Sequence, residues 1–263
     1  MTAPLRPGDP GTVAVVGLGR LGAVLADRLA ERLTVLLHDA DPKVTRQVAV
    51  DLSLPDMEPR ELLAAADTVL LCVPPAETAR VLRRLATLAR QLGRRPLFVN
   101  MATSVPTHEL PDVGLEVVGL KPVCQFAAVA LGLKTVLVTS APHRIGLLRT
   151  LAADLGEVVL GPEEVVGPAN RAATKASLRA CAELAAELTE RGLPAELVKA
   201  AIRNVFVGTA LDYPPPDSNT YTRSVLDELA AEAVQRQPSP TAPLDPLGWA
   251  AWAERPVSPG GPA

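Results

Sequence analysis

Cysteine and histidine are scarce in this sequence, with three residues of each type among 263. Cys72, Cys124 and Cys181 are widely spaced and form no C-x-x-C pair, so neither a disulfide framework nor a zinc site is expected. The three histidines are equally scattered, and a metal site of any kind is therefore not predicted.

Blocks of charge and long apolar runs are also missing. The 26 basic and 29 acidic residues give a net charge of −3 and are dispersed along the chain, which predicts neither a nucleic-acid-binding face nor a membrane-binding patch. No apolar run reaches membrane-spanning length, and the first ten residues lack the apolar segment of a secretory signal. We expect a cytoplasmic, globular protein that acts on a small molecule.

A glycine-rich turn follows the first apolar segment, at residues 13–16. Gly17, Gly19 and Gly22 form the pattern G-x-G-x-x-G in front of a helical pattern. In a strand-turn-helix unit the first glycine permits the bend, the second lets a pyrophosphate approach the backbone, and the third allows close helix packing. Glycines that serve packing alone are the alternative. The predicted cofactor contacts in this turn are Gly17, Leu18, Gly19, Arg20, Leu21 and Gly22.

Asp39 ends the next predicted strand, at the offset of about twenty residues where an acidic side chain binds the ribose of a dinucleotide. This residue favours NADH over NADPH, because a carboxylate repels the extra phosphate. A second interpretation makes Asp39 the N-cap of a helix that starts near Pro42, and the two roles are compatible.

Further strands are predicted at residues 68–74, 96–102, 115–120, 134–140 and 157–161, and helical patterns separate several of them. This alternation is typical of an α/β fold with a parallel sheet covered on both faces. We therefore predict a Rossmann-type dinucleotide-binding domain over residues 11–162, after an N-terminal tail at 1–10.

Ligands of such sheets bind beyond the carboxyl ends of the strands. Three short segments are expected along that crevice, and each has a plainer alternative: prolines stop strands, an asparagine caps a turn, and a lysine is solvated. They are Val73, Pro74 and Pro75, the segment from Asn100 to Ser104, and Lys121 with Pro122.

From residue 163 the composition becomes rich in Ala, Leu and Glu, which predicts a small all-helical domain over 163–237. One helix should run from about 169 to 191 and stop at Gly192-Leu193-Pro194. A second should cover 195–213, and a third should start near Ser218, Asn219 and Thr220, whose side chains can cap it. The apolar positions exceed one helical stripe, so burial against the first domain or another subunit is expected. Residues 238–263 are Pro-rich and predict an irregular tail.

The order of these motifs resembles the pyrroline-5-carboxylate reductase family, within the 6-phosphogluconate dehydrogenase-like oxidoreductases. The resemblance spans about residues 12–232 and rests on VGLGRLG, LLCVPP, GPA at Gly167, Pro168 and Ala169, RGLP, and DSNTYT where that family has a Gly-Gly-Thr-Thr loop. It implies an NAD(P)H-dependent enzyme that reduces a small carboxylate-bearing imine. It also implies a homodimer formed through the helical domain, with the active site between one subunit's helices and the other's dinucleotide domain.

Several positions depart from that family. The resemblance implies an active-site threonine before a glycine of the second helix, and Asn204 and Thr209 are the nearest residues here. The loop glycines are replaced by Ser218 and Asn219, which leaves the substrate open. A helix start at Gly167–Ala169 offers an anchor for the substrate carboxylate, and Ser218, Asn219 and Thr220 complete the predicted substrate contacts.

Two further function classes stay open. A β-hydroxyacid or prephenate-type dehydrogenase needs a proton donor or acceptor, and Lys175 resembles the helix lysine of the β-hydroxyacid dehydrogenases, although a solvated Lys175 is an equal alternative. Lys121-Pro122 replaces the His-Pro pair of prephenate-type enzymes. The third class is a dinucleotide-binding protein without turnover. The candidate catalytic residues are Lys175, Asn204, Thr209 and Lys121.

Overall fold

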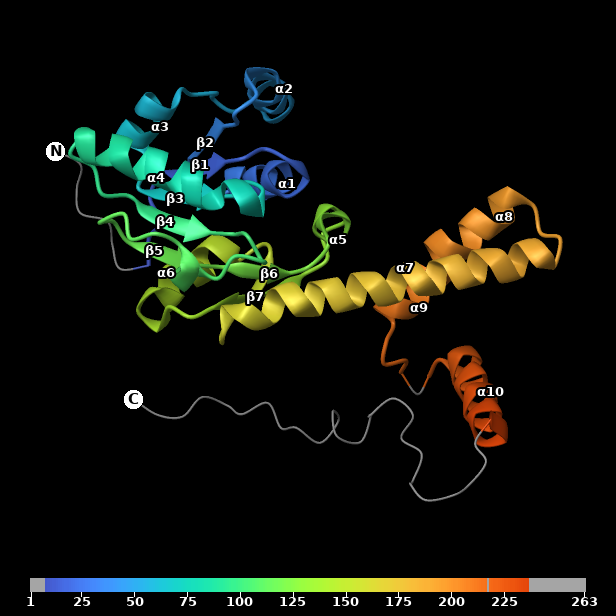
Figure 1. The fold of residues 1–263 in the computed structure, drawn as a ribbon. Helices are drawn as coiled ribbons and strands as arrows, with labels where there is room; N and C mark the ends of the chain where they lie inside the picture. The colour runs from blue at the N-terminus through green and yellow to red at the C-terminus, as the bar shows by residue number, and fades with distance from the viewer. Residues whose placement is uncertain (1–7, 217, 237–263) are drawn as a thin grey trace. The chain divides into compact units, whose positions relative to one another are not determined.

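The computed structural model describes residues 8–216 and 218–236. The chain forms two compact units, one up to Ala176 and one from Ser177 onward (Figure 1). The division falls within helix α7 (Val166–Glu190), whereas the sequence pattern placed the domain boundary at residue 162.

The first unit contains a five-stranded parallel sheet with the strand order β2-β1-β3-β4-β5. Every strand coincides with a predicted apolar segment, and all four neighbouring pairs are parallel. The predicted α/β fold with an N-terminal Rossmann-type sheet is therefore confirmed. The strands are β1 (Val13–Val16), β2 (Val35–His38), β3 (Thr68–Leu71), β4 (Leu97–Asn100) and β5 (Val117–Gly119).

A second sheet of three strands was not predicted. It consists of β6 (Lys121–Val123), β7 (Thr135–Thr139) and β8 (Gly156–Leu160). β6 runs antiparallel to β7, while β7 and β8 are parallel. The sequence expectation that the last two strands continue one parallel sheet was wrong. β6 is only three residues long and contains a lysine and a proline, so it has no apolar signature of a strand.

Helices cover both faces of the parallel sheet. Three of them start with proline in the first turn, where the missing N–H has no intrahelical partner to lose. The α-helices are α1 (Arg20–Ala30), α2 (Pro42–Leu52), α3 (Pro59–Ala65), α4 (Pro75–Gln91), α5 (Phe126–Ala130) and α6 (Ile145–Ala152). Short 3₁₀ turns are η1 (Thr107–Glu109), η2 (Pro142–Arg144) and η3 (Glu163–Val165).

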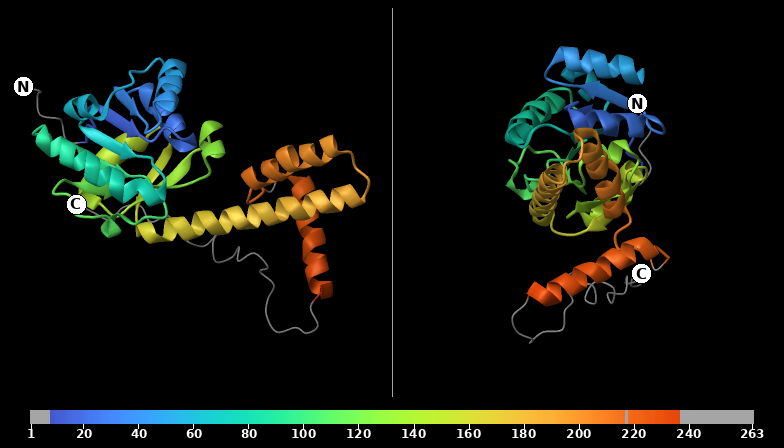
Figure 2. Two further views of the ribbon diagram at one scale, coloured as in Figure 1. Left: turned by 45° about the horizontal axis from the view of Figure 1, so that its top comes forward. Right: turned by 90° about the vertical axis from the view of Figure 1, so that its right-hand side faces the viewer.

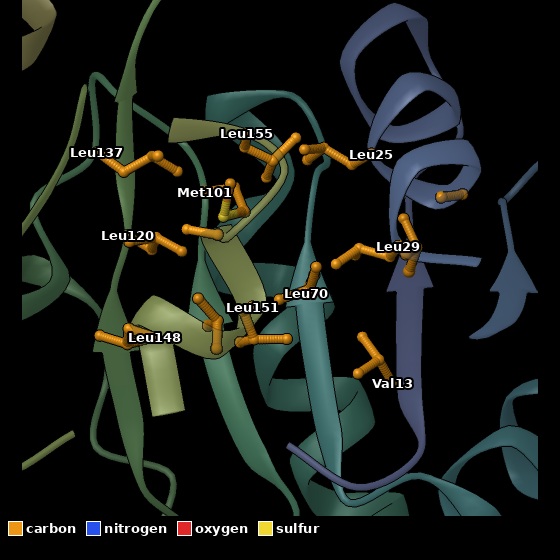
Figure 3. Packing of buried hydrophobic residues seen from close by; sticks show 14 of the residues in the cluster. Val13, Leu25, Leu29, Leu70, Met101, Leu120, Leu137, Leu148, Leu151 and Leu155 are labelled. Carbon is orange, nitrogen blue, oxygen red and sulfur yellow. The ribbon is translucent and has the colours of Figure 1, made fainter. Parts of the chain in front are cut away.

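Two hydrophobic cores follow from the alternation of side chains along the strands. Val13 and Val15 face the core shared with α1 and α6, while Ala14 and Val16 face the core shared with α3 and α4. Figure 3 shows Leu29 of α1 and Leu151 of α6 on either side of Leu70 from β3. A fully buried leucine contributes roughly 1.5–3 kcal/mol to stability, so these two layers hold the strand ends in place.

The second unit is helical, as predicted. It contains the rest of α7, α8 (Ala195–Ala200), the π-helical segment η4 (Ala201–Phe206), α9 (Val207–Leu211) and α10 (Thr220–Arg236). Gly192 adopts a φ of 79° between α7 and α8, which confirms the predicted stop. The expected second helix is present but interrupted by η4. α8 to α9 run beside α7 (Figures 1 and 2).

Residues 1–7 of the predicted N-terminal tail, Asp217 of the DSNTYT motif and residues 237–263, which include the predicted C-terminal tail, lie outside the described residues. Among the described residues, no helix is long and apolar enough to span a bilayer.

Candidate functional site

The three glycines of the β1–α1 turn have different surroundings. Gly17 has a φ of 93°, and a Cβ there would lie 2.7 Å from the Cys72 carbonyl oxygen. A Cβ on Gly22 would lie 1.9 Å from the Gly17 carbonyl oxygen, whereas a Cβ on Gly19 would meet nothing within 4 Å. The bend predicted at the first glycine and the close packing predicted at the third are thus confirmed. Gly19 leaves an open approach to the backbone, which fits a phosphate group.

The N-terminus of α1 opens on this turn. Its N-cap, Gly19, makes no side-chain cap hydrogen bond, so the first amide groups and the positive end of the helix dipole are available to an anion. Arg20 is exposed, and its guanidinium lies 4.8 Å from the centre of the Phe126 ring of α5. No salt bridge joins Arg20 to a carboxylate within residues 8–216 and 218–236. The Arg20 charge at this turn is therefore not neutralised by an ion pair with any described residue.

Asp39 links this turn to the loop after β2. Its Oδ2 accepts the Leu18 N–H at 2.7 Å, and its Oδ1 accepts the Asp41 N–H at 2.9 Å. The capping interpretation of Asp39 was wrong, because Asp41 is the N-cap of α2 and accepts the Lys43 N–H. Each carboxylate oxygen of Asp39 keeps a lone pair for a ligand hydroxyl.

Asp39 and the glycine turn line one cavity of about 520 Å³. Val73 and Pro74, which follow β3, line it as well. A neighbouring cavity of about 330 Å³ shares Asp39 and Arg84 and adds the carboxyl groups of Asp56, Glu58 and Glu61. Carboxylates therefore outnumber arginines around the end of the crevice next to β2.

A third cavity, of about 210 Å³, lies beyond β3 and β4 and is mostly apolar. Burial raises the pKa of the Cys72 thiol to about 12 and also raises the pKa of Cys124, so both thiols stay protonated at neutral pH. The lining contains no Lys, Arg, His, Asp or Glu. It consists of Leu21, Cys72, Val73, Pro75, Met101, Ala102, Thr103, Pro122, Cys124, Phe126 and Asn170.

Asn100 and Lys121, both predicted in the crevice, are wholly buried. Asn100 holds the turn after β4, where its side chain accepts the Ala102 N–H at 3.0 Å and donates to Val105 O at 2.9 Å. Lys121 donates to the carbonyls of Ala102 and Val105 at 2.9 Å each. The solvated interpretation of Lys121 was wrong, and neither side chain lines a cavity described above.

The predicted carboxylate anchor at Gly167, Pro168 and Ala169 lies inside the first turn of α7. The helix begins at Val166, directly after η3, and the Val166 N–H is already bonded to Glu163 O. Pro168 has no N–H, so this end offers fewer free amides than a helix start at Ala169 would. The geometry gives the anchor no support.

Asn170 was missed by the sequence analysis and lines the third cavity. Its Nδ2 donates to Pro122 O at 3.0 Å, and no pattern in the sequence marks this contact. Lys175, two helical turns into α7, is exposed and has no ion-pair partner among the described residues.

The remaining candidates belong to the second unit. Asn204 is exposed within η4, and Thr209 donates its hydroxyl to Val205 O. Asn219 accepts the Thr222 N–H and donates to Asp212, which confirms the predicted cap of α10. Ser218 and Thr220 flank it, and none of these five predicted residues lines the three cavities of the first unit.

Cys72, Cys124 and Cys181 are free cysteines. Within the described part of the chain, no group of three His, Cys, Asp or Glu side chains is placed to hold a metal ion.

Comparisons with known proteins agree with this geometry. Residues 12–110 match the NAD binding domain of 6-phosphogluconate dehydrogenase. No curated protein sequence matches the chain. The predicted resemblance to the 6-phosphogluconate dehydrogenase-like oxidoreductases is thus confirmed over residues 12–110.

The solved structures that resemble this chain share its fold at low identity. A pyrroline-5-carboxylate reductase from Coxiella burnetii is 14% identical with a TM-score of 0.67, covering 86% of this chain and 91% of that one. The pyrroline carboxylate reductase of Plasmodium falciparum, with NADP bound, is 14% identical with a TM-score of 0.61 and 80% of both chains covered. A 3-hydroxyisobutyrate dehydrogenase from Mycobacterium tuberculosis is 19% identical with a TM-score of 0.54, covering 70% and 67%.

Proposed function

We propose that the chain is an NADH-dependent oxidoreductase that reduces a small cyclic imine bearing a carboxylate. The observation that carries this proposal is the lining of the third cavity, which holds no group that titrates near neutral pH. A protonated imine accepts a hydride without a dedicated acid, whereas a ketone needs a proton donor at its oxygen. Three of the structurally similar proteins are named as pyrroline carboxylate reductases.

The order of the strands supports the orientation of the cofactor. Asp39 follows β2, the glycine turn follows β1, and Val73 and Met101 follow β3 and β4. Asp39 would hold the adenosine ribose of a dinucleotide, the backbone at Gly19 would hold its pyrophosphate, and the residues of the third cavity would hold its nicotinamide. A bound nicotinamide supplies the hydride, and the apolar walls exclude water from its path.

The preference for NADH rests on charge. Asp39, Asp56, Glu58 and Glu61 surround the ribose end and outweigh Arg46 and Arg84. A 2′-phosphate brought there meets repulsion and forfeits the hydrogen bonds that ribose hydroxyls make to Asp39.

A β-hydroxyacid dehydrogenase is the second candidate, favoured by the similarity to the 3-hydroxyisobutyrate dehydrogenase fold. A dehydrogenase of this kind requires a group that transfers a proton, such as Lys175, and the Lys175 side chain would have to reach the substrate from α7.

We also propose that the helical unit pairs with a second copy of the chain. Leu184, Leu188, Val205 and Phe206 line an apolar groove of about 640 Å³ in that unit. Such a surface is typical of a homodimer contact.

The reaction is tested with a panel of carboxylated cyclic imines plus NADH, and of hydroxy acids plus NAD. Consumption of NADH by an imine, with Lys175→Met retaining about a third or more of the turnover, is the expected result because a protonated imine needs no lysine. Hydroxy-acid oxidation abolished by Lys175→Met would establish the dehydrogenase instead. Tight NADH binding without turnover on any substrate would favour a non-catalytic dinucleotide-binding protein.

A further inference from the structure

Three residues of the third cavity lie on the turn after β4, and a buried lysine holds that turn from within. Met101, Ala102 and Thr103 line the cavity. The Lys121 side chain of β6 is 0% exposed, and its Nζ lies 2.9 Å from both Ala102 O and Val105 O. A buried ammonium loses its hydration and is retained only where such acceptors replace water.

Glu163 of η3 completes the cluster. Its carboxylate is 3% exposed and lies 3.5 Å from Lys121 Nζ. It accepts the N–H and hydroxyl of Thr107, at 2.9 and 2.7 Å, and the Ser140 hydroxyl at 2.7 Å. A Cβ on Gly119 would lie 2.1 Å from a Glu163 oxygen, so the bare glycine leaves room for the carboxylate. The cluster joins the turn after β4 to β6, to the end of β7 and to η3.

The same turn supports the start of α7. A Cβ on Gly167 would lie 2.9 Å from Thr103 O, so the helix and the turn are packed backbone to backbone. Asn170, one turn of helix further, lines the third cavity beside Thr103. A displacement of the turn therefore moves two walls of the cavity together, although Lys121 itself does not line it.

We infer that Lys121 is a positioning residue: through the Ala102–Val105 turn it sets the shape of the nicotinamide end of the site. The identity of the ligand in that cavity rests on the proposed function. A role in stability alone is the competing explanation. Positioning predicts a weaker affinity only for ligands that reach the third cavity, whereas a role in stability alone predicts no such difference between ligands.

NADH and ADP-ribose distinguish them, because ADP-ribose lacks the nicotinamide. Lys121→Met removes the two hydrogen bonds to the turn and keeps an unbranched side chain out to the Cε position. We expect the Kd of NADH to rise about tenfold, since misplacement of a wall by a fraction of an ångström weakens a fitted ligand. The Kd of ADP-ribose should stay within about twofold of the parent value, since its contacts are at Asp39 and Gly19.

A double variant separates positioning from stability. Lys121→Met leaves Glu163 buried without its cation, which destabilises the fold, whereas Lys121→Met with Glu163→Gln removes both charges and should restore much of the melting temperature. The NADH defect should persist in the double variant, because Ala102 O and Val105 O still lack the Lys121 ammonium. A defect that disappears as the melting temperature recovers would overturn the inference.

Arg94→Met is the matched control. Arg94 also donates to a carbonyl and a carboxylate, Ala66 O and Asp67 at 3.1 Å each, but just before β3, at the amino-terminal end of the strands and opposite to the end that carries the cavity. This variant should lower the melting temperature and leave both Kd values near the parent values. Equal losses for NADH and ADP-ribose in Lys121→Met, or none, would refute positioning. These binding measurements need no turnover, so a failure to reduce any imine would overturn the proposed function alone.

Discussion

The two units treat the same apolar residue types in opposite ways. In the first unit Leu62, Leu82 and Leu148 are 0% exposed, because helices from the same chain cover both faces of the sheet. In the second unit Leu178, Val205 and Leu211 are 66%, 63% and 57% exposed. The first unit therefore buries its large apolar side chains within the same chain. The second unit exposes apolar side chains of the kind that proteins usually bury against a partner.

The self-contained packing of the first unit is broken most severely at Gly22. Gly22→Val places a branched side chain where even a Cβ would lie 1.9 Å from Gly17 O. We expect loss of folding or a destabilisation above about 4 kcal/mol, as for severe overpacking. Thermal and urea unfolding followed by circular dichroism measure it.

Gly19→Ala is the matched change in the same turn, since a Cβ there meets nothing within 4 Å. It should fold with the parent's melting temperature and weaken NADH binding, because the methyl group occupies the approach to the backbone. Equal stability of the two variants would show that the turn is not packed as described.

A charged residue placed in the exposed apolar surface of the second unit tests whether this surface forms a dimer contact. Val205→Asp should shift a dimer to monomer at micromolar concentration, since a buried unpaired carboxylate costs several kcal/mol. Val50→Asp is the control, because Val50 of α2 is 75% exposed in the first unit and should leave the mass unchanged. Light scattering gives the mass, and a monomeric parent would end the dimer proposal.

Elements with a local apolar pattern could be predicted from the sequence, whereas an element that depends on contacts with distant residues could not. The five parallel strands were found because each is a short apolar run beside a turn signal, and Gly17, Gly19, Gly22 and Asp39 fall at offsets fixed by backbone geometry. β6 was missed because a segment that contains Lys121 and Pro122 lacks the apolar pattern of a strand. The lysine can be buried there because it pairs with Glu163, some forty residues away. A polar contact between residues far apart in the chain produces no repeating pattern in the sequence.

Lys121 shows the limit of motif reasoning for the candidate site. Its place after β5 predicted a ligand contact, yet its ammonium bonds to the turn beside the cavity. Asn170 was missed for the reverse reason, since its contact with Pro122 depends on how α7 packs on β6. Positions set by the local backbone were predictable, whereas those set by packing between distant elements were not.

A smaller effect is expected at Asp39, where the fold stays intact and only cofactor choice changes. Asp39→Asn keeps an oxygen for the Leu18 N–H, which Asp39 accepts at 2.7 Å, and removes the charge. The preference for NADH over NADPH should fall by about 1–3 kcal/mol, the range of a charge-assisted hydrogen bond. Titration with both cofactors measures it; equal affinities in the parent would contradict the proposed preference.

The smallest effect concerns acid stability and again separates the units. Burial alone would raise the pKa of Glu163, but the hydroxyls of Thr107 and Ser140 and the Lys121 ammonium lower it below the ordinary 4.5. A carboxyl group with a lowered folded-state pKa stabilises the fold fully above its unfolded value and loses that contribution as the pH falls through the folded value. The parent should therefore lose stability below pH 4.5 more steeply than Glu163→Gln. Glu187→Gln, in an exposed pair with Arg191, should follow the parent curve within about 0.5 kcal/mol. Urea unfolding across the acid range measures both, and parallel curves for the parent and Glu163→Gln would show that the buried cluster contributes no acid sensitivity.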